Sequence, residues 1–288
     1  TGIASGFAFV LASSIVLDRA ARERRPDWVA IFYSGVGAGI VLTGIVVPPL
    51  GAFGGWRAGW LGLAAISALL AAVTLPGLTD RADPTKPHEV DPERGASPKL
   101  FVWLLLAYGG NGFAYVIPAT FMVAMIAATP AVARFAAISW IVVGLVGIPS
   151  TVIWNRLGLA LGRDRALGIA LLVLGFGTVA PIISPNALGV IVAAATLGGT
   201  FMGITALASA LGRQLFPHGS HVAIGRLTAA FGIGQIVGPA LAGVLVAKAG
   251  SYAPALVIAA CVSCASAGVI FVGSVIASGG FRRRANAS

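Results

Sequence analysis

The sequence predicts an all-α, polytopic membrane protein, and three observations lead to that fold class. The 288 residues are 58% hydrophobic and only 10% charged, whereas an ordinary soluble domain is about 25% charged. The mean hydropathy is +0.95, so the chain has too little polar surface to cover a water-facing globule. Its apolar residues also gather in long runs separated by polar segments, which is typical of membrane-spanning helices.

Nine apolar runs are each about 17 residues or longer, enough to cross a hydrocarbon core about 30 Å thick as a helix. A charged segment after the third run separates three spans from six. In chain order, the predicted spans are 1–17, 28–50, 58–79, 99–128, 132–155, 165–185, 187–212, 221–249 and 251–279.

Basic residues alternate from one connection to the next. Basic loops stay in the cytoplasm during membrane insertion, so the alternation supports both the spans and a cytoplasmic C-terminus. It also explains the net charge of +10 without a nucleic-acid partner. Only Arg57, Arg134 and Lys248 fall on the outer face. The other 16 of the 19 basic residues are cytoplasmic: Arg19, Arg22, Arg24, Arg25, Arg81, Lys86, Arg94, Lys99, Arg156, Arg163, Arg165, Arg213, Arg226, Arg282, Arg283 and Arg284.

The connection TDRADPTKPHEVDPERGASP holds four prolines and charges of both signs. Such a segment buries too little apolar surface to fold by itself, which predicts a flexible linker. The chain begins at Thr1 without a polar lead or signal peptide, as if it were cut there. Three spans precede the linker and six follow it, so we expect three further helices ahead of Thr1 to complete a first half of six. The predicted organisation is the last three helices of an N-terminal half (1–79), a cytoplasmic linker (80–98), a six-helix C-terminal half (99–279) and a cytoplasmic tail (280–288).

The sequence offers no chemistry for a membrane-embedded enzyme. Cys261 and Cys264 share one apolar segment without a second pair for zinc, so we expect them to pack within a helix. His88, His218 and His221 give no metal-ligand spacing. The predicted spans have no Asp, Glu, His or Lys at depth, and no phosphate-binding motif occurs. We therefore predict neither a catalytic site nor a cofactor.

Two predicted spans share a pattern of glycine and proline, and each position lies 190 residues from its partner. Six helices separate them, so both run in the same direction, as expected for parallel transporter repeats. In lipid, small residues permit close helix contact, which predicts packing ridges at Gly234–Gly238–Ala242 and Gly35–Gly39–Thr43. The later copy comprises Gly225, Gly234, Gly238, Pro239, Ala242 and Gly243, and the earlier one Gly35, Gly44, Pro48, Pro49 and Ala52.

Four passages carry a resemblance to a known family: GFAFVLASSIVLDR, YGGNGFAYVIPATFMVAMI, LGGTFMGITALASALGR and RLTAAFGIGQIVGPALAG. Together they resemble the major facilitator superfamily, and within it the YbfB/YjiJ-like branch. The resemblance covers nearly the whole chain. It implies a major-facilitator-type bundle that lacks its first three helices, so that the nine predicted spans are helices four to twelve of twelve.

The resemblance also implies functional motifs. The glycine pattern resembles the superfamily's antiporter motif, although the better copy lies on helix eleven and the helix-five copy has Pro48 in place of a glycine. The segment NRLGLALGRDR resembles the cytoplasmic loop motif, with Asn155 in place of an acid. Asp18 matches the acid that related transporters pair with the first copy of that motif. Asp18, Arg19 and Arg156 are therefore candidates for a cytoplasmic charge network.

The same resemblance implies that helices four, seven and ten line a central cavity. On helix seven, Tyr108, Asn111, Tyr115 and Pro118 recur at three and four residues, forming one polar stripe that faces either a cavity or another helix. Gln235, near the middle of its span, makes an interhelical hydrogen bond or lines the cavity. Further polar positions, for which bonding to the helix's own carbonyls is the alternative role, are Thr196, Thr200, Thr205, Ser209, Ser13 and Ser14.

These features predict a secondary active transporter that moves a small solute by alternating access and couples it to an ion. The alternative is a transporter-like receptor or scaffold without transport activity. The expected partners are a small-molecule substrate, the lipid bilayer and a coupling proton, with the protein a monomer in the bacterial inner membrane. Because the predicted spans contain no midplane carboxylate, we expect the proton-coupling group to lie on helices one to three.

Overall fold

The computed structural model describes residues 12, 15–16, 19–20, 23, 25–74, 98–216 and 220–285. Every regular element in these ranges is a helix. They are α2 (Pro26–Thr74), α3 (Pro98–Ala128), the short 3₁₀ helix η2 (Ala133–Phe135), α4 (Ala136–Leu161), α5 (Arg163–Thr178), α6 (Ala180–Ile183), α7 (Ala187–Leu215), α8 (Ser220–Ala249) and α9 (Ala253–Ala285).

Seven helices in the described ranges are long and apolar enough to cross a membrane. The sequence predicted nine spans. The first, 1–17, falls mostly outside the described residues, and the next two, 28–50 and 58–79, fall within the single helix α2. Each of the other six corresponds to one spanning candidate, with α5 and α6 together accounting for 165–185. The chain is thus an all-α, multi-pass membrane protein, and the expected helices ahead of Thr1 stay a prediction.

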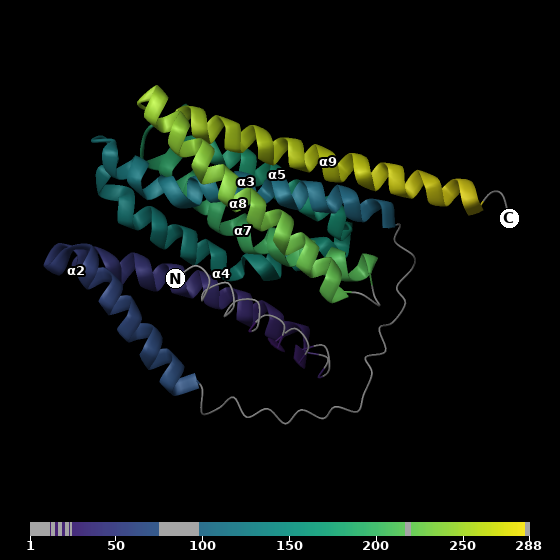
Figure 1. Ribbon diagram of the computed structural model, residues 1–288, viewed down its shortest axis with the longest axis horizontal. Helices are drawn as coiled ribbons and strands as arrows, with labels where there is room; N and C mark the ends of the chain where they lie inside the picture. Colours follow the sequence, from purple (N-terminus) through teal and green to yellow (C-terminus); the bar gives the residue numbers. More distant parts are fainter. Residues whose placement is uncertain are drawn as a thin grey trace.

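Helix α2 folds back on itself at two glycines, which explains why two predicted spans form one element. Gly54 and Gly55 leave the helical conformation, and Gly55 has a φ of 64°, in the left-handed region that favours glycine. Beyond the bend, a Cβ on Gly62 would meet the Leu50 side chain, so the two arms contact each other. Figure 1 shows the resulting V shape at one end of the molecule.

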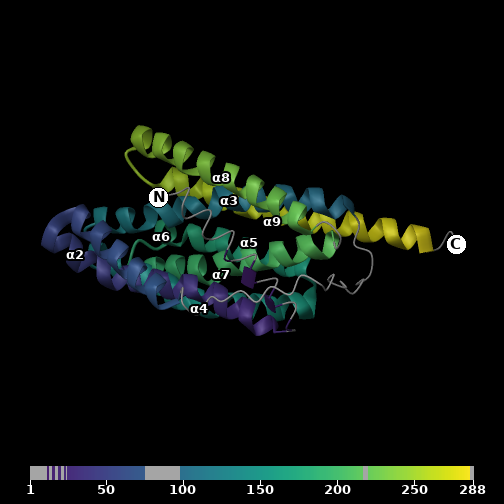
Figure 2. The ribbon, with the colours of Figure 1, turned by 60° about the horizontal axis from the view of Figure 1, so that its bottom comes forward.

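The spanning helices form two groups. Helix α4 packs most extensively on α2 and α7, whereas α3 packs on α8 and α9. Helix α5 joins the groups through its contacts with α7 and α9. Figure 2 shows α2, α4 and α7 along one side and α8, α3 and α9 along the other. The main buried cluster lies between α3, α5 and α7, and a smaller one between α3, α8 and α9.

Close backbone contact holds α4 against α7. A Cβ on Gly198 would collide with the Val143 carbonyl, so this glycine lets the two backbones touch. The Trp154 indole N–H donates to the Gly199 carbonyl at 2.7 Å, and the Gly203 amide donates to the Ser150 hydroxyl at 3.1 Å. Such hydrogen bonds add to packing where lipid supplies no hydrophobic drive for association.

Candidate functional site

The polar stripe predicted on helix seven lies on α3 and faces the protein interior. Tyr108 is 6% exposed and Asn111 1% exposed, while Tyr115 is half-buried. The Asn111 Oδ1 atom is buried and has no hydrogen-bond partner among the described residues. A buried amide oxygen without a partner is costly in a low-dielectric interior. The stripe therefore contains a buried hydrogen-bond acceptor, Asn111 Oδ1, that has no donor among the described residues.

Four aromatic rings from three helices form a stack beside this stripe, which we call the aromatic column. Its members are Tyr108, Phe231, Tyr115 and Phe201, in that order. Phe231 of α8 lies 4.8 Å from Tyr108 and 5.5 Å from Tyr115, centroid to centroid, with interplanar angles of 17° and 14°. Phe201 of α7 also stacks on Tyr115, at 5.3 Å and 9°. The column thus joins α3, α7 and α8.

Gln235 connects α8 to the stripe. Its Nε2 atom donates to the Tyr115 hydroxyl at 3.1 Å, which is one of the two roles expected for this amide. Pro239, inside α8, has no N–H to donate to the carbonyl four residues earlier. That carbonyl belongs to Gln235, so it loses its usual donor within the helix. Pro118 has the same effect on the Ala114 carbonyl of α3.

The hydroxyl groups on α7 bond mainly to their own helix. Thr200, which is buried, donates to the Thr196 carbonyl at 2.7 Å, and Thr196 donates to Val192 at 2.8 Å. Thr205 donates to the Phe201 carbonyl at 3.1 Å and also shares a side-chain hydrogen bond with Tyr108. Thr205 therefore reaches the stripe on α3 as well. Ser209 is half-buried, and Ser13 and Ser14 lie outside the described residues.

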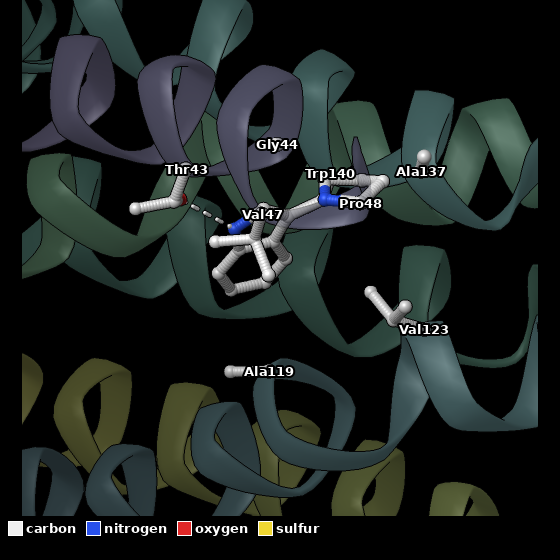
Figure 3. A pocket seen from close by; sticks show the side chains of 8 residues that line it. All are labelled: Thr43, Gly44, Val47, Pro48, Ala119, Val123, Ala137 and Trp140. Atoms are coloured by element: carbon white, nitrogen blue, oxygen red, sulfur yellow. Dashed lines mark hydrogen bonds between the residues drawn. The ribbon is translucent and has the colours of Figure 1, made fainter. Parts of the chain in front are cut away.

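A cavity of about 250 Å³ lies one helical turn along α3 from Tyr115; we call it the lateral cavity (Figure 3). Ala119 and Val123 continue the four-residue spacing of Asn111 and Tyr115. Helix α2 closes one side and α4 another. The lining residues are Thr43, Gly44, Val47, Pro48, Ala119, Val123, Ala137 and Trp140.

The polar side chains in the cavity wall satisfy each other. The Trp140 indole N–H donates to the Thr43 hydroxyl at 3.2 Å, the bond drawn in Figure 3. The Thr43 hydroxyl in turn donates to the Ile40 carbonyl at 2.9 Å. With both groups engaged, the surface that faces the cavity is apolar. An occupant would meet hydrocarbon at this end and hydrogen-bonding groups one turn away at Tyr115.

The later copy of the glycine pattern lies against α3. A Cβ on Gly234 would meet the Gly109 carbonyl and the Phe113 amide, and one on Gly238 would lie 2.7 Å from the Phe113 carbonyl. Ala242 is fully buried beside them. Gly225 and Gly243 are exposed, and a Cβ on either would meet nothing within 4 Å, so they do not belong to the ridge.

For the earlier copy, the prediction of a Gly35–Gly39–Thr43 ridge needs correction. A Cβ on Gly35 or Gly39 would meet nothing within 4 Å, and both residues are exposed. The contact with α4 is made by Gly37, whose Cβ would lie 2.7 Å from the Ile148 amide, and by Gly44, which faces Ile141. Helix α2 therefore packs on α4 through the face that carries Gly37 and Gly44, and not through the expected face that carries Gly35 and Gly39. Pro49 is exposed beside Pro48, inside α2.

The predicted cytoplasmic charge network is not assembled in the described residues. Arg19 forms an ion pair with Glu23 at 2.9 Å, and both side chains are largely exposed. Arg156 is exposed, with no ion pair in the part of the chain that the structure describes. Asp18 lies outside that part.

A different polar cluster connects three helices, α5, α7 and α9. The Arg163 Nη1 atom at the start of α5 donates to Gln214 Oε1 of α7 at 2.9 Å. Next to it, the Asp164 carboxylate accepts a hydrogen bond from the Ser274 hydroxyl of α9. These contacts connect the ends of α5, α7 and α9. Sequence reasoning used Arg163 as a topology signal and as part of the segment NRLGLALGRDR that resembles the loop motif, but it did not predict these contacts.

Sequence reasoning also missed Phe201, Phe231 and Trp140. Phenylalanine is common in spanning helices, so composition alone gives no reason to single out either one. Spacing carried a weak signal: Phe231 lies four residues before Gln235, and Phe201 four before Thr205, which places each ring on the same helix face as a polar group. The partnership between Trp140 and Thr43 spans 97 positions, and no local pattern predicts it.

No group of metal-ligating side chains occurs among the described residues, and the described site consists of neutral polar, aromatic and apolar groups in a helical membrane bundle. Among curated proteins, no match to the chain is found. A family model does match residues 1–271, and its description is "Uncharacterised MFS-type transporter YbfB". This match covers most of the chain, and it agrees with the spanning helices and the motifs on α3, α7 and α8. The chain therefore belongs to the YbfB family of major-facilitator-type membrane transporters.

Proposed function

We propose that the protein is a secondary active transporter that carries a small solute by alternating access, and that the solute binds along the α3 stripe. The observation that carries this proposal is the placement of the lateral cavity. Ala119 and Val123 of its wall follow Asn111 and Tyr115 at four-residue spacing on α3, and α2 and α4 form the other walls. Lipid cannot satisfy polar groups at this depth, so such a stripe fits a site that a solute visits.

The size of the cavity supports a small solute. Its volume of about 250 Å³ is slightly below the range of about 300 to 1,000 Å³ typical of pockets for drug-sized ligands. A molecule of a few rings or fewer would fill it. Larger molecules would require α2 to move away from α3 and α4.

The contact of α2 with the rest of the bundle is suited to movement. The α2 backbone packs on α4 at both Gly37 and Gly44, whereas from Thr43 to Pro48 the lateral cavity lies between α2 and α3. A close contact with α4 and a cavity toward α3 allow α2 and α4 to rock together relative to α3 and change access to the cavity. Rocking of one helix group against another is the usual basis of alternating access.

Ion coupling is part of the proposal, and the coupling group is expected outside the described spans. The sequence has no Asp, Glu or His between residues 28 and 79 or between 99 and 163. Asp164 lies at the first turn of α5 and is bonded to Ser274. A proton relay at the midplane would therefore belong to other helices of the full-length protein, as would any charge that balances an ionic solute. The orientation with a cytoplasmic C-terminus and the bacterial inner membrane belong to the same proposal, supported by the basic connections.

The test is transport by the full-length protein in sealed vesicles. Vesicles with an imposed pH gradient are incubated with a panel of labelled small solutes, and uptake is compared with that of protein-free vesicles. We expect at least one solute to accumulate or be expelled as long as the gradient lasts. The Ala119→Trp variant, which fills the lateral cavity, should abolish that flux while the purified protein keeps its helical content by circular dichroism. Undiminished flux by a folded Ala119→Trp variant would contradict the placement of the site.

A receptor or scaffold gives a different result in the same experiment. Such a protein would bind a solute without moving it across the vesicle membrane, with or without a gradient. Binding without flux for every solute in the panel would therefore favour the alternative over transport.

A further inference from the structure

The space between α2 and α3 is occupied differently at its two ends. Helix α2 packs its backbone mainly on α4, so its contacts with α3 and α7 depend on side chains that reach across. Near the bend of α2, Val47 and Pro48 line the lateral cavity together with Ala119 and Val123 of α3. These short side chains leave the cavity between the two helices. Near its start, α2 carries a much larger side chain, Tyr33.

Tyr33 is buried, although α2 has the smallest share of buried residues among the described spanning helices. Its side chain is 3% exposed. Among the α2 residues whose burial the structure describes, the other buried positions are all glycines, Gly37, Gly44 and Gly59. Tyr33 is therefore the one large side chain in this part of α2 that is enclosed by the bundle. It lies on the same face as Gly37 and Gly44, at spacings of 4 and 11 residues.

The electrostatic partners of Tyr33 come from α3 and α7. Tyr33 interacts with Arg213, in the last turn of α7, and with Tyr108 of α3. Tyr108 is itself buried and shares a side-chain hydrogen bond with Thr205 of α7. Two buried phenol groups thus bridge α2, α3 and α7 at this end of the bundle.

This bridge and the lateral cavity follow each other along the same pair of helices. Tyr33 precedes Val47 on α2 by 14 residues, about 21 Å along a straight helix. Tyr108 precedes Ala119 on α3 by 11 residues, about 16 Å by the same measure. On each helix the tyrosine lies toward the start and the cavity residue toward the end. A solute that left the cavity toward the starts of α2 and α3 would have to pass between the two tyrosines.

We propose that Tyr33 is the gate that closes the solute site toward the end of the bundle where α2 and α3 begin. Its ring fills the space between α2, α3 and α7, with Tyr108 and Arg213 on the other side. Movement of α2 relative to α3 withdraws the ring and opens the cavity to that end, which is cytoplasmic in the proposed orientation. This inference rests on the proposed transport function and names the residue that separates the site from one side of the membrane.

Thiol accessibility from each side of the membrane tests the gate. Full-length protein with Cys261→Ser and Cys264→Ser receives one new thiol, Ala119→Cys, in the wall of the lateral cavity. Right-side-out and inside-out membrane vesicles each present one side to the charged, membrane-impermeant reagent trimethylammonioethyl methanethiosulfonate. The rate of modification is followed by the mass of the protein, without solute or pH gradient. With Tyr33 in place, we expect slow modification from the side where α2 begins and faster modification from the other side.

Variants of α2 identify the residue responsible. A minor conformer is typically populated at about 10% or less, so removing the gate by Tyr33→Ala should raise the slow rate about tenfold or more. Tyr33→Phe keeps the ring and should stay slow. Ile31→Ala is the matched control on the same helix, because Ile31 is 65% exposed, and it should react as the native sequence does. If Tyr33→Ala does not accumulate in the membrane, Tyr33→Leu replaces it, since leucine is apolar but shorter than tyrosine.

Two results would overturn the proposal. One is equal modification of Tyr33→Ala and Ile31→Ala from the side where α2 begins, and the other is fast modification from that side with Tyr33 in place. The failure of the transport proposal looks different. Access that depends on Tyr33, without flux of any solute in the panel, would refute transport and leave the barrier standing. Solute flux together with access that does not depend on Tyr33 would refute the gate and leave transport standing.

Discussion

Helices α2 and α8 carry the same glycine and proline spacing, yet they make different contacts. Gly44 of α2 and Gly234 of α8 occupy matching positions, and each presses against a neighbouring helix. Gly35 and Gly225 also match, and a Cβ on either would meet empty space. The helices diverge one turn later. There α8 has Gly238, packed on the Phe113 carbonyl, whereas α2 has Pro48, which lines the lateral cavity.

The difference shows how one pattern can build both a closed and an open contact. Along α8, a second glycine continues the close approach, so α8 and α3 stay in contact past Gly238. Along α2, the ring of Pro48 stands where the second glycine would be, and the lateral cavity lies between this part of α2 and both α3 and α4. The open contact is where a solute can bind, and the closed one holds the aromatic column in place.

The largest expected effect is on stability, at the closed contacts. Gly234→Ala should lower the free energy of unfolding toward the upper end of about 1 to 3 kcal/mol, because the added Cβ would collide with the backbone of α3. A Cβ on Gly225 would meet nothing within 4 Å, so Gly225→Ala should leave the free energy of unfolding unchanged or raise it. Thermal unfolding of the purified full-length protein measures both. Equal midpoints for the two variants would mean that α8 does not press on α3.

The same comparison applies to α2, at positions two residues apart. Gly37→Ala should destabilise the protein by about 1 to 3 kcal/mol, because its Cβ would approach the α4 backbone at Ile148 and Gly144. Gly39→Ala should be neutral, since its face is open. The measurement is again thermal unfolding. If Gly39→Ala destabilised the protein more than Gly37→Ala, α2 would pack through the Gly35–Gly39–Thr43 ridge that the sequence predicted, and the packing through Gly37 would be wrong.

An intermediate effect is expected at the polar stripe. Tyr115→Phe removes the acceptor for Gln235 and should weaken solute affinity about two- to tenfold, the value of one hydrogen bond. Asn111→Ala should have an effect of similar size on affinity. Equilibrium binding of the transported solute gives both values. Unchanged affinity in both variants would mean that the stripe serves helix packing alone.

The smallest effect concerns the wall of the cavity. Trp140→Phe removes the indole N–H that donates to Thr43, and the free energy of unfolding should fall by about 0.6 kcal/mol, the average for interhelical hydrogen bonds in membranes. A double-mutant cycle with Thr43→Val isolates the bond from the change in ring size. A coupling energy near zero would show that the two groups do not hold α2 to α4.

Much of the helical framework followed from apolar run length. The predicted spans 187–212 and 221–249 correspond to Ala187–Leu215 and Ser220–Ala249, because about 20 apolar residues in lipid have few alternatives to a helix. The junction of the second and third spans was less predictable. The sequence indicated a connection between 50 and 58, but the chain reverses at Gly54 and Gly55 alone, and helix continues on both sides.

The site was less accessible to sequence reasoning than the helices were. Tyr108, Asn111 and Tyr115 could be assigned to one face because residues on a helix repeat at a fixed angle. The contacts that surround them depend on how α3, α4, α7 and α8 are rotated about their axes. Small residues occur on several faces of α2, so spacing could not distinguish Gly37 from Gly39. For the same reason, the lateral cavity had no sequence signature.

Cross-linking across the lateral cavity tests the central claim most directly. Val47 of α2 and Val123 of α3 line the cavity from different helices (Figure 3), and both are replaced by cysteine in a protein with Cys261→Ser and Cys264→Ser. A reducible thiol-specific linker then joins α2 to α3, and solute flux is measured in vesicles before and after reduction. We expect the linked protein to be inactive and reduction to restore flux, with the protein that carries only Cys261→Ser and Cys264→Ser unaffected by the linker. Full flux in the linked protein would contradict the claim that the solute site lies where α2 opens from α3.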